Sequence, residues 1–134
     1  MQISEVARLS GLTTKTIRYY EEIGLVDPAS RGVNGYRQYD VGSLGQLRFL
    51  ARARDVGFNL EESRQLLELL RDSGRQSAHA RSLVLEKSDQ LQKKIDQLHD
   101  MQAVLNNMAR RCNGDEGPEC AILDELAGQA GPLS

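Results

Sequence analysis

The feature that most constrains this chain is a long helical stretch near its C-terminal end. Residues 78–111 contain neither glycine nor proline, and at ~1.5 Å per residue such a helix is on the order of 50 Å long. We call its heptad-spaced apolar side chains the dimer stripe: Val84, Leu91, Ile95, Leu98, Met101, Leu105 and Met108. Left in water, each forgoes roughly 1.5–3 kcal/mol of burial. The pattern therefore predicts a homodimer through a coiled coil.

The first 25 residues are typical of two short helices joined by a turn. The apolar side chains of the first helix are Ile3, Val6, Ala7 and Leu9. Gly11 stands where that helix would end, and Thr13 or Thr14 can cap a second helix that runs to Ile23 and ends at Gly24. The spacing fits a helix-turn-helix and a simple helical hairpin equally well.

The second helix carries a cationic face. Lys15, Arg18 and Tyr19 follow one another at i, i+3 and i+4. An ammonium, a guanidinium fork and a phenol on one face suit phosphate and guanine-edge contacts in a major groove. Ile17 and Leu25 are expected to face the core. The alternative is that the cationic face is an ordinary solvated surface.

Residues 31–39 predict a β-hairpin beside this helix. Asn34-Gly35 suits a type I′ turn, and Arg31, Tyr36 and Arg37 surround it. A basic hairpin after a helix-turn-helix is a wing, which we favour over a plain surface hairpin. The expected DNA contacts are Lys15, Arg18, Tyr19, Tyr20, Arg31, Asn34, Tyr36 and Arg37.

Two further helices complete a DNA-binding domain over residues 1–71. Asp40 can cap a helix running to about Val56, whose apolar side chains are Leu44, Leu47, Leu50 and Ala51. Asn59, with Glu62 three positions later, can cap a helix over 60–71. This helix is expected to pack through Leu60, Leu66, Leu67, Leu69 and Leu70. The dimerisation helix at 78–111 and a C-terminal segment at 112–134 follow. The fold class is mainly α.

Cys112 and Cys120 enclose a loop that contains Gly114, Gly117 and Pro118, and a short helix at 121–126 is expected after it. Buried structural thiols, a redox switch and a metal site all fit this spacing. Zinc usually takes four protein ligands, whereas two thiolates suit a soft monovalent ion.

Three segments resemble the MerR family of metal- and stress-responsive transcription regulators: TIRYYEEIGLV (16–26), NGYRQYD (34–40) and RARDVGFNLEES (52–63). Within that family the loop CNGDEGPECAIL (112–123) is most similar to that of copper-efflux regulators of the CueR type. Ser77, where zinc and mercury regulators carry cysteine, agrees with that subgroup. Two departures are Ala121, where relatives commonly carry proline, and His79, where an acidic residue is common.

The resemblance implies one Cu(I), Ag(I) or Au(I) ion per chain, held by Cys112 and Cys120. Ser77 and Arg81 stand at the start of the dimerisation helix, whose positive dipole end favours the net negative charge of two thiolates and one monovalent ion. In an antiparallel dimer this end lies near the partner's metal loop. His79 could add a third ligand, which would admit Zn(II) or Hg(II). A response to a divalent metal or to thiol oxidation is the alternative function.

The resemblance also implies a mechanism. The dimer binds promoter DNA whose two elements are too far apart, with or without metal. Metal binding then bends and undertwists the spacer, so that RNA polymerase can use both elements. The implied targets are genes for copper export or detoxification.

Other function classes find little support in the composition. No nucleophile–base pair or carboxylate dyad indicates an enzyme, and no apolar run approaches the ~20 residues of a membrane span. The start, MQISEVARLSG, lacks the pattern of a secretory signal. Cytoplasm is the expected location. The last 23 residues hold five acidic and no basic side chains, so the net charge of −2 conceals a more basic remainder.

Overall fold

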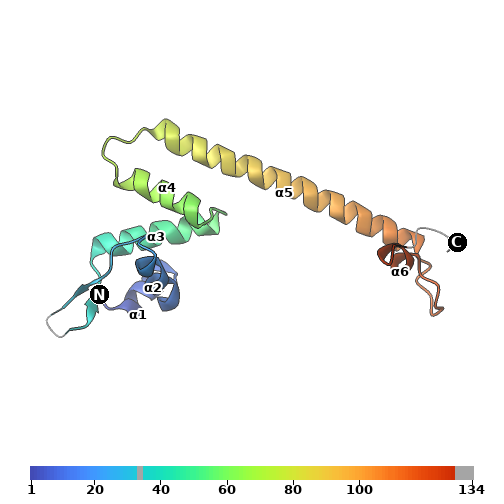
Figure 1. Cartoon of the computed structure of the whole chain (residues 1–134), viewed down its shortest axis with the longest axis horizontal. Coiled ribbons are helices and arrows are strands. Elements are labelled where there is room, and N and C mark those ends of the chain that lie inside the picture. The colour runs from blue at the N-terminus through green and yellow to red at the C-terminus, as the bar shows by residue number, and fades with distance from the viewer. Residues whose placement is uncertain (33–34, 129–134) are drawn as a thin grey trace. The chain divides into compact units, whose positions relative to one another are not determined.

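The computed structural model of this chain describes residues 1–32 and 35–128. The elements are α1 (Ile3–Ser10), α2 (Thr14–Glu22), β1 (Ser30–Arg31), β2 (Arg37–Gln38), α3 (Val41–Asp55), α4 (Leu60–Arg71), α5 (Ser77–Arg111) and α6 (Ala121–Leu126) (Figure 1). They form two compact units, Met1–Lys87 and Ser88–Ser134. The mainly helical fold class is confirmed.

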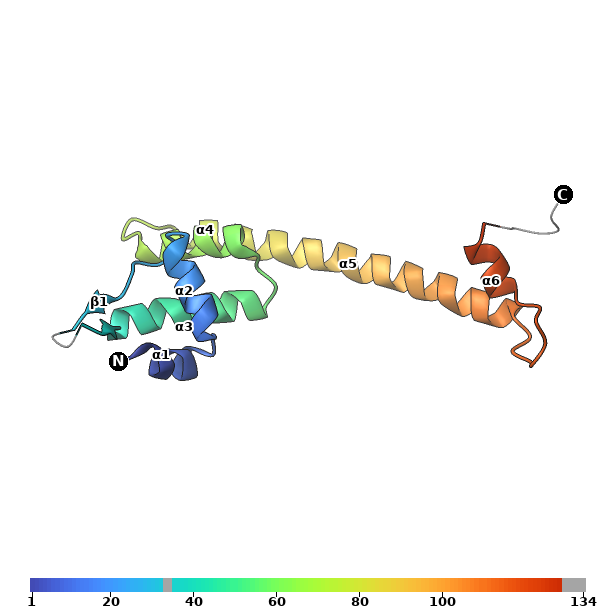
Figure 2. The same ribbon diagram turned by 60° about the horizontal axis from the view of Figure 1, so that its bottom comes forward.

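The first unit has its core where α1, α2, α3 and α4 meet. Helix α3 packs against both α1 and α4, and α1 packs against α2 (Figure 2). The most deeply buried large side chains are Val6, Ile17, Leu25, Leu47, Leu50 and Leu67. The predicted burial of Ile17 and Leu25, and that of the apolar face of α3, is therefore confirmed.

Side-chain caps fix where three of these helices begin. The Thr13 hydroxyl accepts from the Thr16 N–H at 3.0 Å, and the Asp40 carboxylate accepts from the Ser43 N–H at 2.7 Å. Asn59 and Glu62 form a reciprocal capping box at the start of α4. Gly11 ends α1 at φ +81°, a left-handed conformation that glycine adopts at little cost.

The prediction for the packing of α4 is only partly right. Leu67 is buried, Leu66 and Leu69 are half-buried, and Leu60 and Leu70 are exposed. Five leucines within 11 residues extend around more than one face of a helix, and α3 covers only one of those faces.

The wing is a short antiparallel ladder. Ser30 pairs with Gln38 and Arg31 with Arg37. The Gly32 N–H donates to the Tyr36 carbonyl at 2.8 Å and closes the ladder toward its tip. The predicted Asn34-Gly35 turn falls partly on residues 33–34, outside the described residues, while Gly35 has φ +80°.

The second unit consists of the greater part of α5, the loop after it and α6. Most of the dimer stripe is exposed in the single chain, as a dimerisation surface requires. Met108 is an exception at 5% exposure, so its assignment to the stripe is wrong. It precedes Arg111 by one turn, and Arg111 pairs with Glu125 of α6. The returning C-terminal segment therefore shields this end of α5 (Figure 2). Across the described residues, every helix is too short or too polar to cross a membrane.

Candidate nucleic-acid interface and metal centre

Helix α2 presents its cations to solvent. Lys15 and Arg18 are exposed, and Tyr19 beside them is 48% exposed. Within the described part of the chain, neither cation is paired with a carboxylate. Buried Ile17 holds the opposite face of α2 in the core. The helix can thus offer both charges to a polyanion without first breaking an ion pair.

Tyr20 requires a correction. Only 8% of this residue is exposed, and it belongs to the core cluster with Val6 and Ile17. Tyr20 directly follows exposed Tyr19 in the helix. At 3.6 residues per turn, successive side chains point about 100° apart around the helix axis. Tyr20 therefore supports α2 from behind, and its ring is not a surface on which DNA can lie.

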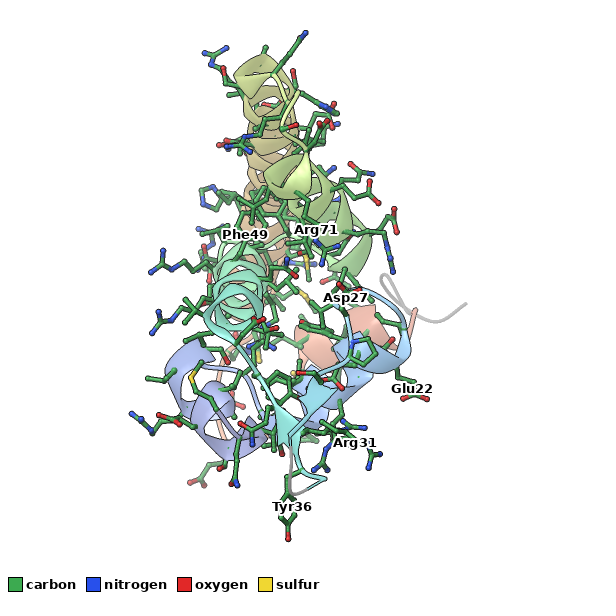
Figure 3. All side chains as sticks on the ribbon, turned by 90° about the vertical axis from the view of Figure 1, so that its left-hand side faces the viewer. Glu22, Asp27, Arg31, Tyr36, Phe49 and Arg71 are labelled. Atoms are coloured by element: carbon green, nitrogen blue, oxygen red, sulfur yellow. The ribbon has the colours of Figure 1, made fainter. Side chains whose placement is uncertain are left out.

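The wing brings two arginines face to face. Arg31 and Arg37 are directly opposite in the ladder, where like charges destabilise a sheet pair. Both are exposed, and Figure 3 shows Arg31 on the hairpin with Tyr36 extending beyond it. A phosphate would relieve the repulsion between the two guanidinium groups. Asn34, also expected here, lies outside the described residues.

A buried carboxylate joins the wing to α2. The Arg37 guanidinium contacts Glu21 at 3.0 Å, and the Tyr39 hydroxyl donates to the other carboxylate oxygen. The Glu21 side chain is 5% exposed, whereas that of Arg37 is 46% exposed. Burial, then the hydrogen bond to Glu21 and the negative charge of that carboxylate, raise the pKa of Tyr39 to about 12. The phenol therefore stays protonated and continues to donate at neutral pH.

The contacts among Glu21, Arg37 and Tyr39 were not predicted from the sequence. The sequence feature that could have revealed the cluster is the position of Glu21. It comes four residues after Ile17 and therefore lies on the buried face of α2. A carboxylate placed there needs a cation or a donor. Arg37 consequently has two roles. It neutralises Glu21, and together with Arg18 it lines a groove between α2 and the wing.

The two cysteines lie side by side. Their sulfur atoms are 3.5 Å apart, and both residues are half-buried and free of disulfides. The backbone N–H of Leu123 at the start of α6, and then the Cys112 thiol, lower the pKa of Cys120. A lowered pKa favours the thiolate, the form that binds metal. The loop therefore supplies two sulfur donors that one ion can reach.

This donor set fits a low-coordinate soft ion. Among the described residues, no group of three or more His, Cys, Asp and Glu side chains could hold a metal. With metal–thiolate bonds of ~2.3 Å, as for zinc, a linear ion needs sulfurs roughly 4.6 Å apart. The thiols would have to separate by about 1 Å, a small adjustment for a surface loop.

The remaining residues expected at the metal lie at the start of α5. Ser77, His79 and Arg81 occupy its first turns and are exposed in the single chain. Their exposure leaves them accessible to a second chain. Their role around the ion, including the third ligand from His79, stays a prediction.

Two family models together match residues 1–108. Residues 1–70 match the MerR HTH family regulatory protein model, and residues 44–108 match the model described as MerR, DNA binding. The HTH-type transcriptional regulator CueR of Escherichia coli O157:H7 is 45% identical over 128 residues, covering 96% of this chain and 95% of that protein. The regulator HmrR of Sinorhizobium medicae is 42% identical over 127 residues, covering 95% of this chain and 86% of that protein.

A solved structure agrees with this match. The transcription regulator PbrR691 from Ralstonia metallidurans CH34, in complex with lead(II), superposes with a TM-score of 0.81 at 30% identity. The superposition covers 94% of this chain and 98% of PbrR691. The relatives are transcription regulators and not enzymes. With cationic α2, its wing and the paired thiols, this chain belongs to the MerR family and is a DNA-binding, metal-responsive transcription regulator.

Proposed function

We propose that this regulator responds to Cu(I), Ag(I) or Au(I), one ion per chain, and controls copper export or detoxification genes. The observation that carries the proposal is the pair of sulfur atoms 3.5 Å apart in Cys112 and Cys120. Two thiolates with a monovalent ion leave one net negative charge, while a divalent ion generally takes more ligands. Ser77 supports this choice because its hydroxyl is a poor ligand for a soft ion.

The proposed mechanism uses a homodimer on promoter DNA with a long spacer. Two copies of α2 and of the wing hold successive half-sites, whether or not metal is present. The ion supplies charge compensation at Cys112 and Cys120, and the chain responds by changing how its DNA-binding units are held. The spacer is then bent and undertwisted so that RNA polymerase engages both promoter elements, with the cost of deformation offset by protein contacts.

Titration of the anaerobic protein with Ag(I) and with Cu(I) tests the choice of metal. We expect saturation at one ion per chain and an X-ray absorption spectrum with two sulfur neighbours and no nitrogen neighbour, because the loop offers only two thiolates. Zn(II) should bind more weakly. The PbrR691 structure holds lead(II), so a divalent response is the specific alternative. Activation by Zn(II) that disappears in His79→Ala would establish it.

The Arg18→Ala variant tests the DNA interface. We expect a loss of ~1–3 kcal/mol of operator affinity together with base discrimination at one position, because Arg18 can bond bidentately to a guanine edge. Arg37→Ala should instead weaken binding to operator and random duplexes alike. Both are measured by fluorescence anisotropy over a range of salt concentrations. Undiminished discrimination in Arg18→Ala would remove Arg18 from the recognition face.

A further inference from the structure

One lysine of α5 is buried against the DNA-binding unit. In the part of α5 that belongs to this unit, Ala80 and Leu83 are half-buried and Lys87 is only 7% exposed. These residues follow at i, i+3 and i+7, so they form one face of the helix. The most buried position on that face therefore holds a charge in place of an apolar side chain.

The Lys87 ammonium has two partners around the start of α4, one in the preceding turn and one in the first turn of the helix. It contacts Glu62 Oε1 at 2.8 Å and lies 5.9 Å from the centroid of the Phe58 ring. The same Glu62 oxygen accepts the Asn59 N–H at 2.8 Å in the capping box of α4. One carboxylate oxygen thus joins the start of α4, the turn before it and α5.

A buried ion pair restricts the orientation of one helix against another more tightly than an apolar contact does. Hydrophobic burial is non-directional, so a leucine at position 87 would tolerate a range of helix orientations. A buried ammonium keeps its stabilising partner only over a narrow range of geometries, because separation leaves a desolvated charge. Helix α5 continues without a break beyond Lys87, so the pair holds the first turns of the helix that carries the dimer stripe.

We propose that the Lys87–Glu62 pair is the positioning contact that couples the dimerisation helix to the DNA-binding unit. In this role Lys87 does not touch DNA or metal. It holds the first turns of α5 against α4. A metal-induced movement of α5 would therefore also move the unit that carries α2 and the wing. The part concerning metal-induced transcription rests on the proposed function above.

The Lys87→Met variant tests this role in the full-length protein. Methionine keeps the length and the apolar contact with Phe58, and it leaves Glu62 with its capping bond to Asn59. We expect operator affinity without metal and Ag(I) stoichiometry to be unchanged, because neither site includes Lys87. The ratio of transcription with and without Cu(I) should fall by about fivefold or more, the size of a typical allosteric coupling.

A measurement on the metal-free protein makes the test independent of metal identity. Spin-label amino acids replace exposed Glu68 of α4 and Lys93 of α5, and labelled chains are diluted with unlabelled ones. The distance distribution should broaden in Lys87→Met and return toward that of the wild type in Lys87→Arg, which retains the cation. Glu61→Gln is the matched control. Glu61 lies in α4 beside Glu62, but it pairs with Arg64 on the surface of that helix.

The outcomes separate the two proposals. A wild-type protein that ignores Cu(I) and Ag(I) would refute the proposed function, while the label distances would still decide the coupling. A distribution in Lys87→Met as narrow as that of the wild type would overturn the positioning role. So would an equal broadening in Glu61→Gln, because the effect would then not depend on the buried pair.

Discussion

Replacing Cys112 or Cys120 by serine is expected to abolish metal-induced transcription while leaving operator binding intact. Each serine removes one of two soft sulfur donors, and a hydroxyl is a poor substitute for a thiolate toward a monovalent soft ion. The DNA-binding residues on α2 and the wing belong to the other compact unit, so we expect their fold to persist without the thiols. In vitro transcription with Cu(I), alongside gel-shift assays of the same proteins, measures both properties.

Glu116→Gln is the matched control for the cysteine variants. Glu116 is an exposed residue of the same loop, so this change removes a charge without removing a sulfur donor, and induction should persist. Full induction in either serine variant would show that metal-induced transcription does not require both thiolates. Induction by peroxide in place of metal, lost in both serine variants, would favour the thiol-oxidation alternative, for which the thiols are already adjacent.

Local sequence rules predicted the boundaries of the helices well. Thr13, Asp40 and Asn59 each cap the helix they were expected to cap, because a cap involves residues only three positions apart. Gly11 ends α1 for a similarly local reason. The apolar face of α3 was also predictable, since its spacing needs no knowledge of the rest of the fold.

The contacts that sequence reasoning missed join residues far apart in the chain. Glu21 meets Arg37 across 16 positions, and Lys87 meets Glu62 across 25. In both pairs a charge occupies a buried position, which composition and periodicity treat as solvated surface. Met108 shows the same limit, because its heptad position agrees with the dimer stripe but its own C-terminal segment shields it.

These long-range pairs also change how the DNA contacts should be understood. Arg37 is predicted from the sequence as a DNA contact, yet it neutralises Glu21 as well. Its removal leaves a buried carboxylate with the Tyr39 hydroxyl as partner, so the loss of DNA affinity in Arg37→Ala includes a rearranged wing. Arg18 has no such second task among the described residues, which makes it the cleaner test of direct recognition.

Leu98→Asp is expected to dissociate the homodimer that we propose. In the single chain Leu98 is 60% exposed, as are Met101 and Leu105 to similar extents. A symmetric dimer loses two leucine burials, roughly 3–6 kcal/mol, or about 10²–10⁴-fold in dissociation constant. The two carboxylates would also be desolvated without partners. Sedimentation equilibrium should then show monomer, while His99→Asp, one position away and outside the stripe, should remain dimeric. A Leu98→Asp protein as dimeric as the His99→Asp control would mean that the stripe packs elsewhere.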